Sequence, residues 1–369
     1  MAERIISADS HVDISRERVL ANLPRQYHEA YEQSSTVLMR KMMEGKPQKQ
    51  LKNKQGPAAQ NTSGPMPSEQ PWEAAGRPGA HDPYERIKDM DIDKVDAEIL
   101  YTNITGGTEF YGLDNDACLA SFQAFNSAAI EFSSVNPDRL IPVYILPLHD
   151  IEEATKELQR IANEGARAIQ LPLYPTECDL APYWDEVYEP LWSAIAEIGL
   201  PISQHVGASD YLMDIMRRDP TPAKGVFQSL PPIFMAEVVA SWIVPGVFDR
   251  HPNLKVVLVE SGLGWIPYYI ARLDKMAERH GWEQLGMTLR EQPSYYWHHN
   301  MFASFEEDEF GIRVRDAIGV ENLLWATDYP HPDCTWPHSQ EIIHEHFKDV
   351  PVDEMRLIVG GNAARIYNL

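Results

Sequence analysis

Short apolar runs alternate with segments of helical periodicity over most of the chain. The runs are four to seven residues long, which suits buried strands. Between them, apolar residues recur at spacings of three and four, as in helices that bury one face. The predicted strands are Ile5–Ala8, Ala97–Tyr101, Ile141–Pro147, Ala166–Leu171, Leu200–His205, Leu254–Glu260, Met301–Phe305 and Leu323–Thr327. The predicted helices include Asn115–Val135, Ile151–Glu164, Trp184–Ile198, Gly264–His280 and Asp308–Ile318.

Eight strands with intervening helices are the number that a (β/α)8 barrel, or TIM barrel, requires. A doubly wound α/β sheet shows the same alternation, but its phosphate-binding glycine fingerprint does not follow the first apolar run. A length of 369 residues lies within the range of one barrel with insertions. The pattern therefore predicts a single α/β barrel domain over residues 1–369.

One long segment, Ser34–Ala80, breaks the alternation after the first strand. It is rich in Gln, Lys, Pro, Gly and Asn and poor in apolar periodicity. Such a segment cannot bury a core of its own, so we expect no strands in it. Because it follows a strand of the barrel, it should leave from the catalytic rim, either as a lid over the barrel mouth or as a contact between subunits.

Polar residues that can bind metal close three of the apolar runs. Asp9 and His11 end the first run and project to the same side because they are two residues apart, while His205 ends the fifth and Asp328 follows the eighth. A single His after a strand is usually a turn residue, and a single Asp is usually a helix N-cap. Their repetition at strand ends, which a closed barrel gathers at one rim, predicts one shared metal site.

The composition of the chain argues against several classes of binding partner. The chain has 55 Asp and Glu against 32 Lys and Arg, a net charge of −23, which argues against nucleic acid or an anionic membrane as a partner. The three Cys residues are widely spaced, so neither a disulfide framework nor a zinc ribbon is indicated. We see no signal peptide and no apolar stretch long enough for a membrane span, and therefore expect a cytoplasmic protein that acts on a small-molecule substrate.

Four short sequence motifs resemble those of a known protein family. They are Ala8–Val12, Val259–Trp265, Thr327–His331 and Gly361–Arg365. The sequence resembles the amidohydrolase-related family of metal-dependent barrels, which includes aminocarboxymuconate-semialdehyde decarboxylase and aromatic-acid decarboxylases. The likeness runs from Ile5 to Leu369, apart from the insertion. It implies a TIM barrel with a divalent metal at its mouth. Within the last phrase, Asn362 is expected to cap a final helix.

The resemblance implies a ligand set. In that family the first strand usually ends in two His residues separated by one residue, which bind metal together with a His from strand five and an Asp from strand eight. The matching positions here are Asp9, His11, His205 and Asp328. Asp9 in place of the first imidazole adds a hard oxygen donor, which shifts the expected metal toward iron or manganese, although zinc also accepts carboxylates.

Two departures from the family pattern bear on the reaction. Glu260 stands where the decarboxylases have a His after strand six, which weakens the decarboxylase interpretation. The neighbourhood of strand four, Ala168–Pro172, offers no Lys to bridge two metals. A second ion would need other ligands, and Glu260 and His331 are the obvious ones. Alternatively, His331 orients the loop after strand eight.

These features leave several functions open. The leading hypothesis is a hydrolase in which one or two divalent ions (Zn, Fe or Mn) activate water. Its substrate would be a small carboxylated or amide-bearing molecule. Glu260 would act as a base or a metal ligand, and Asp328 would shuttle a proton. The first rival is an oxygenase with two irons, or one iron and one manganese, held by the same residues and His331. Further alternatives are a decarboxylase and a non-catalytic paralogue that scaffolds an active subunit. A homo-oligomer, or a hetero-oligomer with a paralogous subunit, is expected.

Overall fold

The computed structural model describes residues 4–34, 73–101, 106–207, 209–280 and 289–369. Eight parallel strands form one sheet in the order β1 to β8, and a bridge between Ser10 and Tyr329 joins the first strand to the segment after the last. The strands are β1 Ile6–His11, β2 Ala97–Tyr101, β3 Leu140–Ile145, β4 Ile169–Gln170, β5 Ile202–His205, β6 Val256–Val259, β7 Met301–Phe305 and β8 Leu323–Trp325. The predicted barrel is confirmed.

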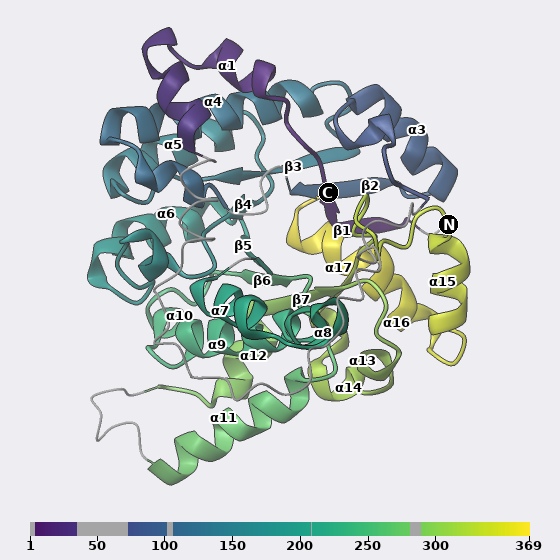
Figure 1. The fold of residues 1–369 in the computed structure, drawn as a ribbon. Coiled ribbons are helices and arrows are strands. Elements are labelled where there is room, and N and C mark those ends of the chain that lie inside the picture. Colours follow the sequence, from purple (N-terminus) through teal and green to yellow (C-terminus); the bar gives the residue numbers. More distant parts are fainter. Residues whose placement is uncertain (1–3, 35–72, 102–105, 208, 281–288) are drawn as a thin grey trace, which may run out of the picture.

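Helices surround the strands (Figure 1). They are α1 Arg16–Asn22, α3 Pro83–Asp93, α4 Asn115–Ser133, α5 Ile151–Asn163, α6 Glu189–Ile198, α7 Asp210–Arg218, α8 Gly225–Ser229, α9 Pro231–Ile243, α10 Val247–Arg250, α11 Ile266–His280, α12 Pro293–Asn300, α13 Glu309–Arg313, α14 Arg315–Ile318, α15 Ser339–His346, α16 Val352–Arg356 and α17 Asn362–Ile366. The helix expected over residues 308–318 is split into α13 and α14, because Val314 leaves helical geometry with ψ 14°. Among these helices none is long and apolar enough to cross a membrane.

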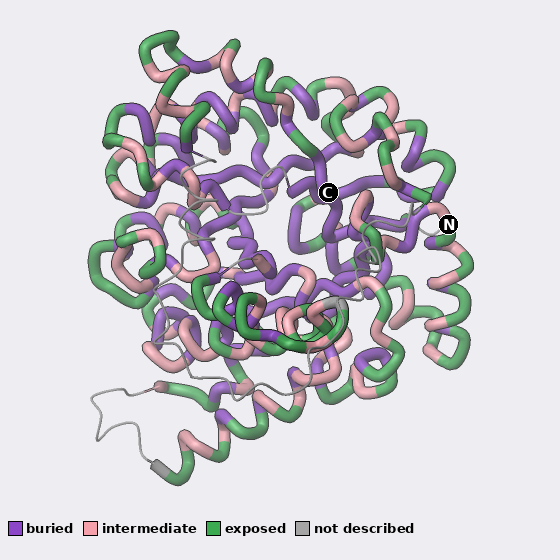
Figure 2. Tube along the Cα trace, viewed as in Figure 1, coloured by how far each residue is buried: buried purple, intermediate pink, exposed green. Residues whose placement is uncertain are grey.

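The core has two layers separated by the sheet. Inward-facing residues such as Ile99, Val143 and Val257 pack together inside the barrel with Ile366 and Tyr367 at the C-terminal end of the chain. Outward-facing strand residues pack against the surrounding helices in a larger cluster. Figure 2 shows the strands buried and the outer turns of the helices exposed. Because apolar side chains fill the barrel interior and α17 contacts β1 and β8, the polar strand ends are left to face one open rim.

The described part of the insertion returns to that rim. Residues 35–72 lie outside the described residues, so the expectation for most of the segment stays a prediction. Near its end, Ala74 packs against Tyr329 and Trp336, and Ala80 O accepts a hydrogen bond of 2.8 Å from Asp13 N. These contacts bring the end of the insertion beside the loop after β8.

The expectation that Asn362 caps the last helix is wrong. Residues Leu357–Gly361 form a π-helical segment that runs directly into α17, so this helix has no free N-terminus to cap. The Asn362 amide instead donates to Val320 O at 2.8 Å and to Leu323 O at 2.9 Å. The side chain therefore fastens α17 to the start of β8.

Candidate active site

A β-bulge in β1 aims Asp9 and His11 at the barrel axis. The register pairs Ser7 with Glu98 and Ser10 with Leu100, so three steps along β1 match two along β2. Strict alternation from the inward-facing Ile6 would turn both Asp9 and His11 outward. The extra residue reverses the alternation beyond it, and His11 pairs with the inward-facing Tyr101.

The structure brings together the four residues expected to share one metal. His11 Nε2 lies 3.5 Å from Asp9 Oδ1 and 3.0 Å from Asp328 Oδ1, and His205 Nε2 lies 3.4 Å from Asp9 Oδ1. The four residues are between 0% and 7% exposed. They come from β1, from the end of β5 and from the segment after β8, so the barrel collects them from opposite ends of the chain.

Several polar atoms of this cluster are buried without a hydrogen bond. They are both carboxylate oxygens of Asp9, Nε2 of His11, Nε2 of His205 and Oδ1 of Asp328. Buried polar atoms are almost always paired, so such a group calls for a missing partner. His205 Nδ1 lies 2.6 Å from Val206 O, which accepts the Nδ1 proton, so Nε2 is the nitrogen that can bind a metal once it has lost its own proton. A divalent cation fits this donor set of imidazole nitrogens and carboxylate oxygens.

Glu260 and Asp328 both stand just beyond the ends of strands in left-handed backbone conformations. Their φ angles are 57° and 54°, a region that costs a non-glycine residue of the order of 1 kcal/mol. Glu260 N donates to Ser304 Oγ at 2.9 Å, and Asp328 N donates to Asp9 O at 3.0 Å. Strained residues held in this way are concentrated at functional sites.

More titratable groups surround this cluster. His331 Nδ1 lies 3.0 Å from Asp328 Oδ2, and Glu260 Oε2 lies 3.9 Å from His205 Nδ1. The sequence analysis missed Asp333, whose carboxylate comes within 4.8 Å of ligand atoms of Glu260 and Asp328. It also missed the Glu306 carboxyl, which has a buried Oε1 without a hydrogen bond. Glu306 directly follows β7, so the strand-end rule that found Asp328 could have found it.

Burial and neighbouring charges perturb the acidity of these groups. Burial, followed by the charges of Asp328 and Asp9, raises the pKa of Glu306 well above its usual value. Burial raises the pKa of Glu260 to about 8, against the opposing effect of His205. For Asp328, burial acts in the same upward direction, but the close contacts of its carboxylate with the imidazoles of His11 and His331 outweigh burial and lower the pKa. Burial would lower the pKa of His205, but Asp9 outweighs it and raises the value to about 9.

Hydroxyl groups and one guanidinium hold β1 in place behind the site. Ser7 Oγ donates to Asp9 O at 2.7 Å, and Thr327 N donates to Ser7 Oγ at 2.9 Å. Arg86 of α3 donates from Nη1 to His11 O at 2.8 Å. The backbones of both β1 ligands are therefore fixed by buried donors, as expected for a preorganised site.

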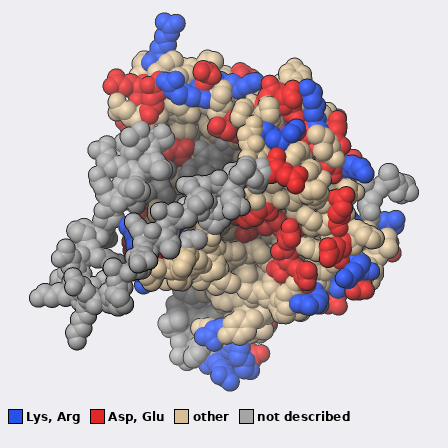
Figure 3. All heavy atoms as spheres, turned by 45° about the vertical axis from the view of Figure 1, so that its right-hand side comes forward, with Lys and Arg blue, Asp and Glu red and all other residues tan. Residues whose placement is uncertain are grey.

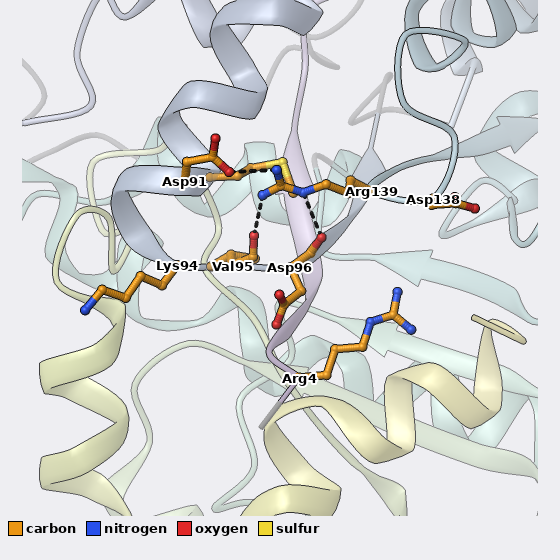
Figure 4. A pocket seen from close by; sticks show the side chains of 8 residues that line it. Arg4, Asp91, Lys94, Val95, Asp96, Asp138 and Arg139 are labelled. Atoms are coloured by element: carbon orange, nitrogen blue, oxygen red, sulfur yellow. Dashed lines mark hydrogen bonds and ion pairs between the residues drawn. The ribbon is translucent and has the colours of Figure 1, made fainter. Parts of the chain in front are cut away.

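A separate pocket lies at the opposite end of the barrel, where Arg4 precedes β1 and Arg139 precedes β3 (Figure 4). Arg139 donates to Asp91 Oδ1 at 2.7 Å, to Val95 O at 2.9 Å and to Asp96 O at 3.0 Å. These bonds tie the end of α3 and the segment after it to the start of β3, so we assign this pocket a structural role. Figure 3 shows acidic side chains gathered near the centre of one face of the molecule, with basic side chains more scattered.

The comparisons with known proteins agree with this fold. Gamma-resorcylate decarboxylase of Rhizobium radiobacter is 25% identical over 271 residues, covering 66% of this chain and 76% of that protein. The 2-amino-3-carboxymuconate-6-semialdehyde decarboxylase of Dictyostelium discoideum is 25% identical over 298 residues, covering 78% of this chain and 77% of that protein.

Solved structures give the same architecture. An amidohydrolase from Mycobacterium avium subsp. paratuberculosis superposes with a TM-score of 0.76 at 21% identity and full coverage of both chains. A 5-carboxyvanillate decarboxylase from Novosphingobium aromaticivorans, solved with manganese and 4-hydroxy-3-methoxy-5-nitrobenzoic acid, gives 0.75 at 19% identity over 100% of this chain and 97% of that one. The family model described as amidohydrolase matches residues 12–369. The chain belongs to the amidohydrolase family.

Proposed function

We propose that this protein is a metal-dependent decarboxylase of a small aromatic or otherwise unsaturated carboxylic acid, with Asp9, His11, His205 and Asp328 holding a divalent ion. The observation that carries the proposal is the set of buried ligand atoms without hydrogen-bond partners at the end of the barrel. The relatives named above support the reaction, since both are decarboxylases. Manganese in the 5-carboxyvanillate enzyme supports a metal of that kind.

The reaction needs a charge acceptor and a proton source. The chemistry supplied by a bound divalent ion is Lewis-acid stabilisation of negative charge. As the bond between the substrate carbon and its carboxylate breaks, carbon dioxide leaves and the electron pair stays on the carbon. That carbon then takes a proton. Glu306 is the residue we assign to this step, because it directly follows β7 at the same rim, its buried Oε1 has no hydrogen-bond partner, and burial raises its pKa and so favours the protonated form.

The test is turnover of 2,6-dihydroxybenzoate and 5-carboxyvanillate by manganese-loaded protein in deuterated water. We expect carbon dioxide release and one deuterium at the vacated ring position. Glu306→Gln should lower kcat by about 10²–10⁴ with little change in KM, and His205→Ala serves as the metal-depleted control. Failure of the loaded protein to release carbon dioxide from these acids would count against decarboxylation. A Glu306→Gln variant with more than a tenth of the activity would remove Glu306 as the donor.

A second candidate function is hydroxylation with dioxygen at a two-metal site. It is favoured by Glu260, which replaces the His of the decarboxylases and lies within 4.8 Å of Asp328 and Asp333 as a potential ligand. Dioxygen uptake by iron-loaded protein, with ¹⁸O incorporated into the product, would support it. Hydrolysis, the leading hypothesis from the sequence, stays a prediction, and we place decarboxylation before it on the names of the relatives.

A further inference from the structure

We propose that Asp89 of α3 is a positioning residue of the metal site, which acts by holding Tyr329 and so the ligand Asp328 that precedes it. The place of Asp89 is set in turn by Arg77, at the end of the insertion. The inference rests on the proposed function only for the identity of the metal ligands, and metal affinity can be measured without turnover.

The backbone of Tyr329 connects two of the proposed ligands. Tyr329 directly follows Asp328, and its carbonyl oxygen accepts a hydrogen bond of 2.6 Å from His11 N. Asp328 has a φ of 54°, a strained conformation that persists only where neighbouring groups hold it. A shift of Tyr329 would therefore displace the backbones of both ligands.

The Asp89 carboxylate binds Tyr329 with one oxygen and Arg77 with the other. Tyr329 Oη donates to Oδ2 at 2.5 Å, while Arg77 donates to Oδ1 from Nε at 2.8 Å and also from Nη2. Asp89 and Tyr329 are each 1% exposed. Hydrogen bonds to a carboxylate are short and about twice as strong as those between neutral groups, so Asp89 joins the two side chains into one unit.

Asp89 also holds the far end of the segment that begins with the ligand. We term residues 328–336 the ligand loop. The carbonyl oxygen of Asp89 accepts a hydrogen bond of 3.0 Å from Trp336 Nε1, and the Arg77 guanidinium lies 4.7 Å from the centre of the Trp336 ring. Together with the contact to Tyr329, these interactions attach the ligand loop to α3 near both of its ends.

Gly79 brings the backbone of the insertion onto this contact. A Cβ at residue 79 would overlap Asp89 Oδ2 and would lie 2.9 Å from Tyr329 Oη. The Gly79 carbonyl oxygen accepts a hydrogen bond of 3.3 Å from Arg86 Nη1. The insertion therefore packs directly on Asp89 and Tyr329, and Gly79→Ala would push this pair apart without removing any side-chain hydrogen bond.

The experiment is Mn²⁺ titration of the full-length protein, with the free ion counted by electron paramagnetic resonance and folding checked by circular dichroism. Tyr329→Phe and Gly79→Ala should each raise Kd for Mn²⁺ by about 10–100-fold, the range typical of groups that orient metal ligands. Arg77→Met should also raise Kd, but should add little in the Tyr329→Phe background, because both changes act through Asp89. Arg77→Lys should recover part of the affinity.

The matched control is Asp93→Asn, which changes a second buried carboxylate of α3. Asp93 accepts hydrogen bonds from Ser339 N at 3.0 Å and from Ser339 Oγ at 2.5 Å, so it joins α3 to α15 beyond the ligand loop. This variant should lower the stability of the metal-free protein but leave Kd for Mn²⁺ within twofold of the parent value.

The outcomes separate a positioning role from general stability and from the proposed function. Folded Tyr329→Phe or Gly79→Ala protein with the parent Kd would overturn the inference, as would additive effects of Arg77→Met and Tyr329→Phe. An equal rise of Kd in Asp93→Asn would also overturn it, because affinity would then follow stability alone. A parent protein that binds no Mn²⁺ would contradict the proposed ligands themselves, whereas a parent that binds Mn²⁺ without decarboxylating would leave the role of Asp89 intact.

Discussion

Replacing Arg86 by Met should destabilise both the fold and the metal site, because this side chain connects them. The guanidinium is 0% exposed. It donates from Nε to Glu98 Oε2 at 2.5 Å and from Nη1 to His11 O at 2.8 Å, and it lies 4.1 Å from the centre of the Tyr329 ring. Its loss leaves Glu98 charged and buried and removes a donor from the backbone of a predicted ligand.

The expected loss in free energy of unfolding follows from these contacts. Breaking a buried ion pair by removing one partner costs about 3–5 kcal/mol. The hydrogen bond to the His11 carbonyl and the ring contact would add about 1–3 kcal/mol if they were independent, but they share one side chain, so we expect about 4–6 kcal/mol in all. Removing both charges in Arg86→Met/Glu98→Met should cost less than Arg86→Met alone, because no buried carboxylate is then left unpaired.

The assay is urea unfolding of metal-free protein at pH 7, with Mn²⁺ affinity measured on the folded variants. The control is Lys88→Met, which removes an exposed partner of Glu85 on the same helix and should cost no more than about 1 kcal/mol. Affinity for Mn²⁺ should fall about tenfold, or 1.4 kcal/mol, in Arg86→Met. A cost below about 1 kcal/mol for Arg86→Met, or a double variant less stable than the single one, would refute the reasoning.

Two further predictions concern the ligands themselves. The raised pKa of His205, about 9, means that a proton must leave before its Nε2 can bind metal, so Mn²⁺ affinity should increase about tenfold per pH unit from pH 6 to 8 for this proton. Calorimetry in buffers of different ionisation enthalpy would count the released protons, and an affinity independent of pH would contradict the assignment. Glu260→Gly should relieve the backbone at φ 57° and remove a half-buried carboxylate, so the metal-free protein should be at least as stable as the parent in urea. A loss of more than about 1 kcal/mol would argue against strain there.

The fold was predictable because strand and helix periodicities follow each other eight times. Strand ends also supplied much of the site, since any barrel collects them at one rim. His205 is the last residue of β5, as expected. The rule depends only on where a strand stops, so it needs no knowledge of long-range contacts.

The features of the site that the sequence did not predict depend on how separate strands pack together. The bulge that turns Asp9 inward arises from pairing with β2, which no local pattern in β1 reveals. Asp333 reaches the site through the path of the loop after β8, and the raised pKa of Glu306 comes first from burial and then from the charges of Asp328, Asp9 and Glu260. Such features exist only once distant segments pack together.

The proposed metal ligands lie at the seam where the first and last strands meet. Asp9 O accepts a hydrogen bond from Asp328 N, and His11 N donates one to Tyr329 O at 2.6 Å. Residues more than 300 positions apart in the sequence therefore complete one site. During synthesis on the ribosome, Asp9 and His11 emerge early, but the site cannot form until β8 and Asp328 have been synthesised. Until then β1 has an unpaired edge, and a chain truncated before Asp328 would expose that edge to aggregation. Metal binding by the proposed ligands therefore requires that β8 has already joined β1.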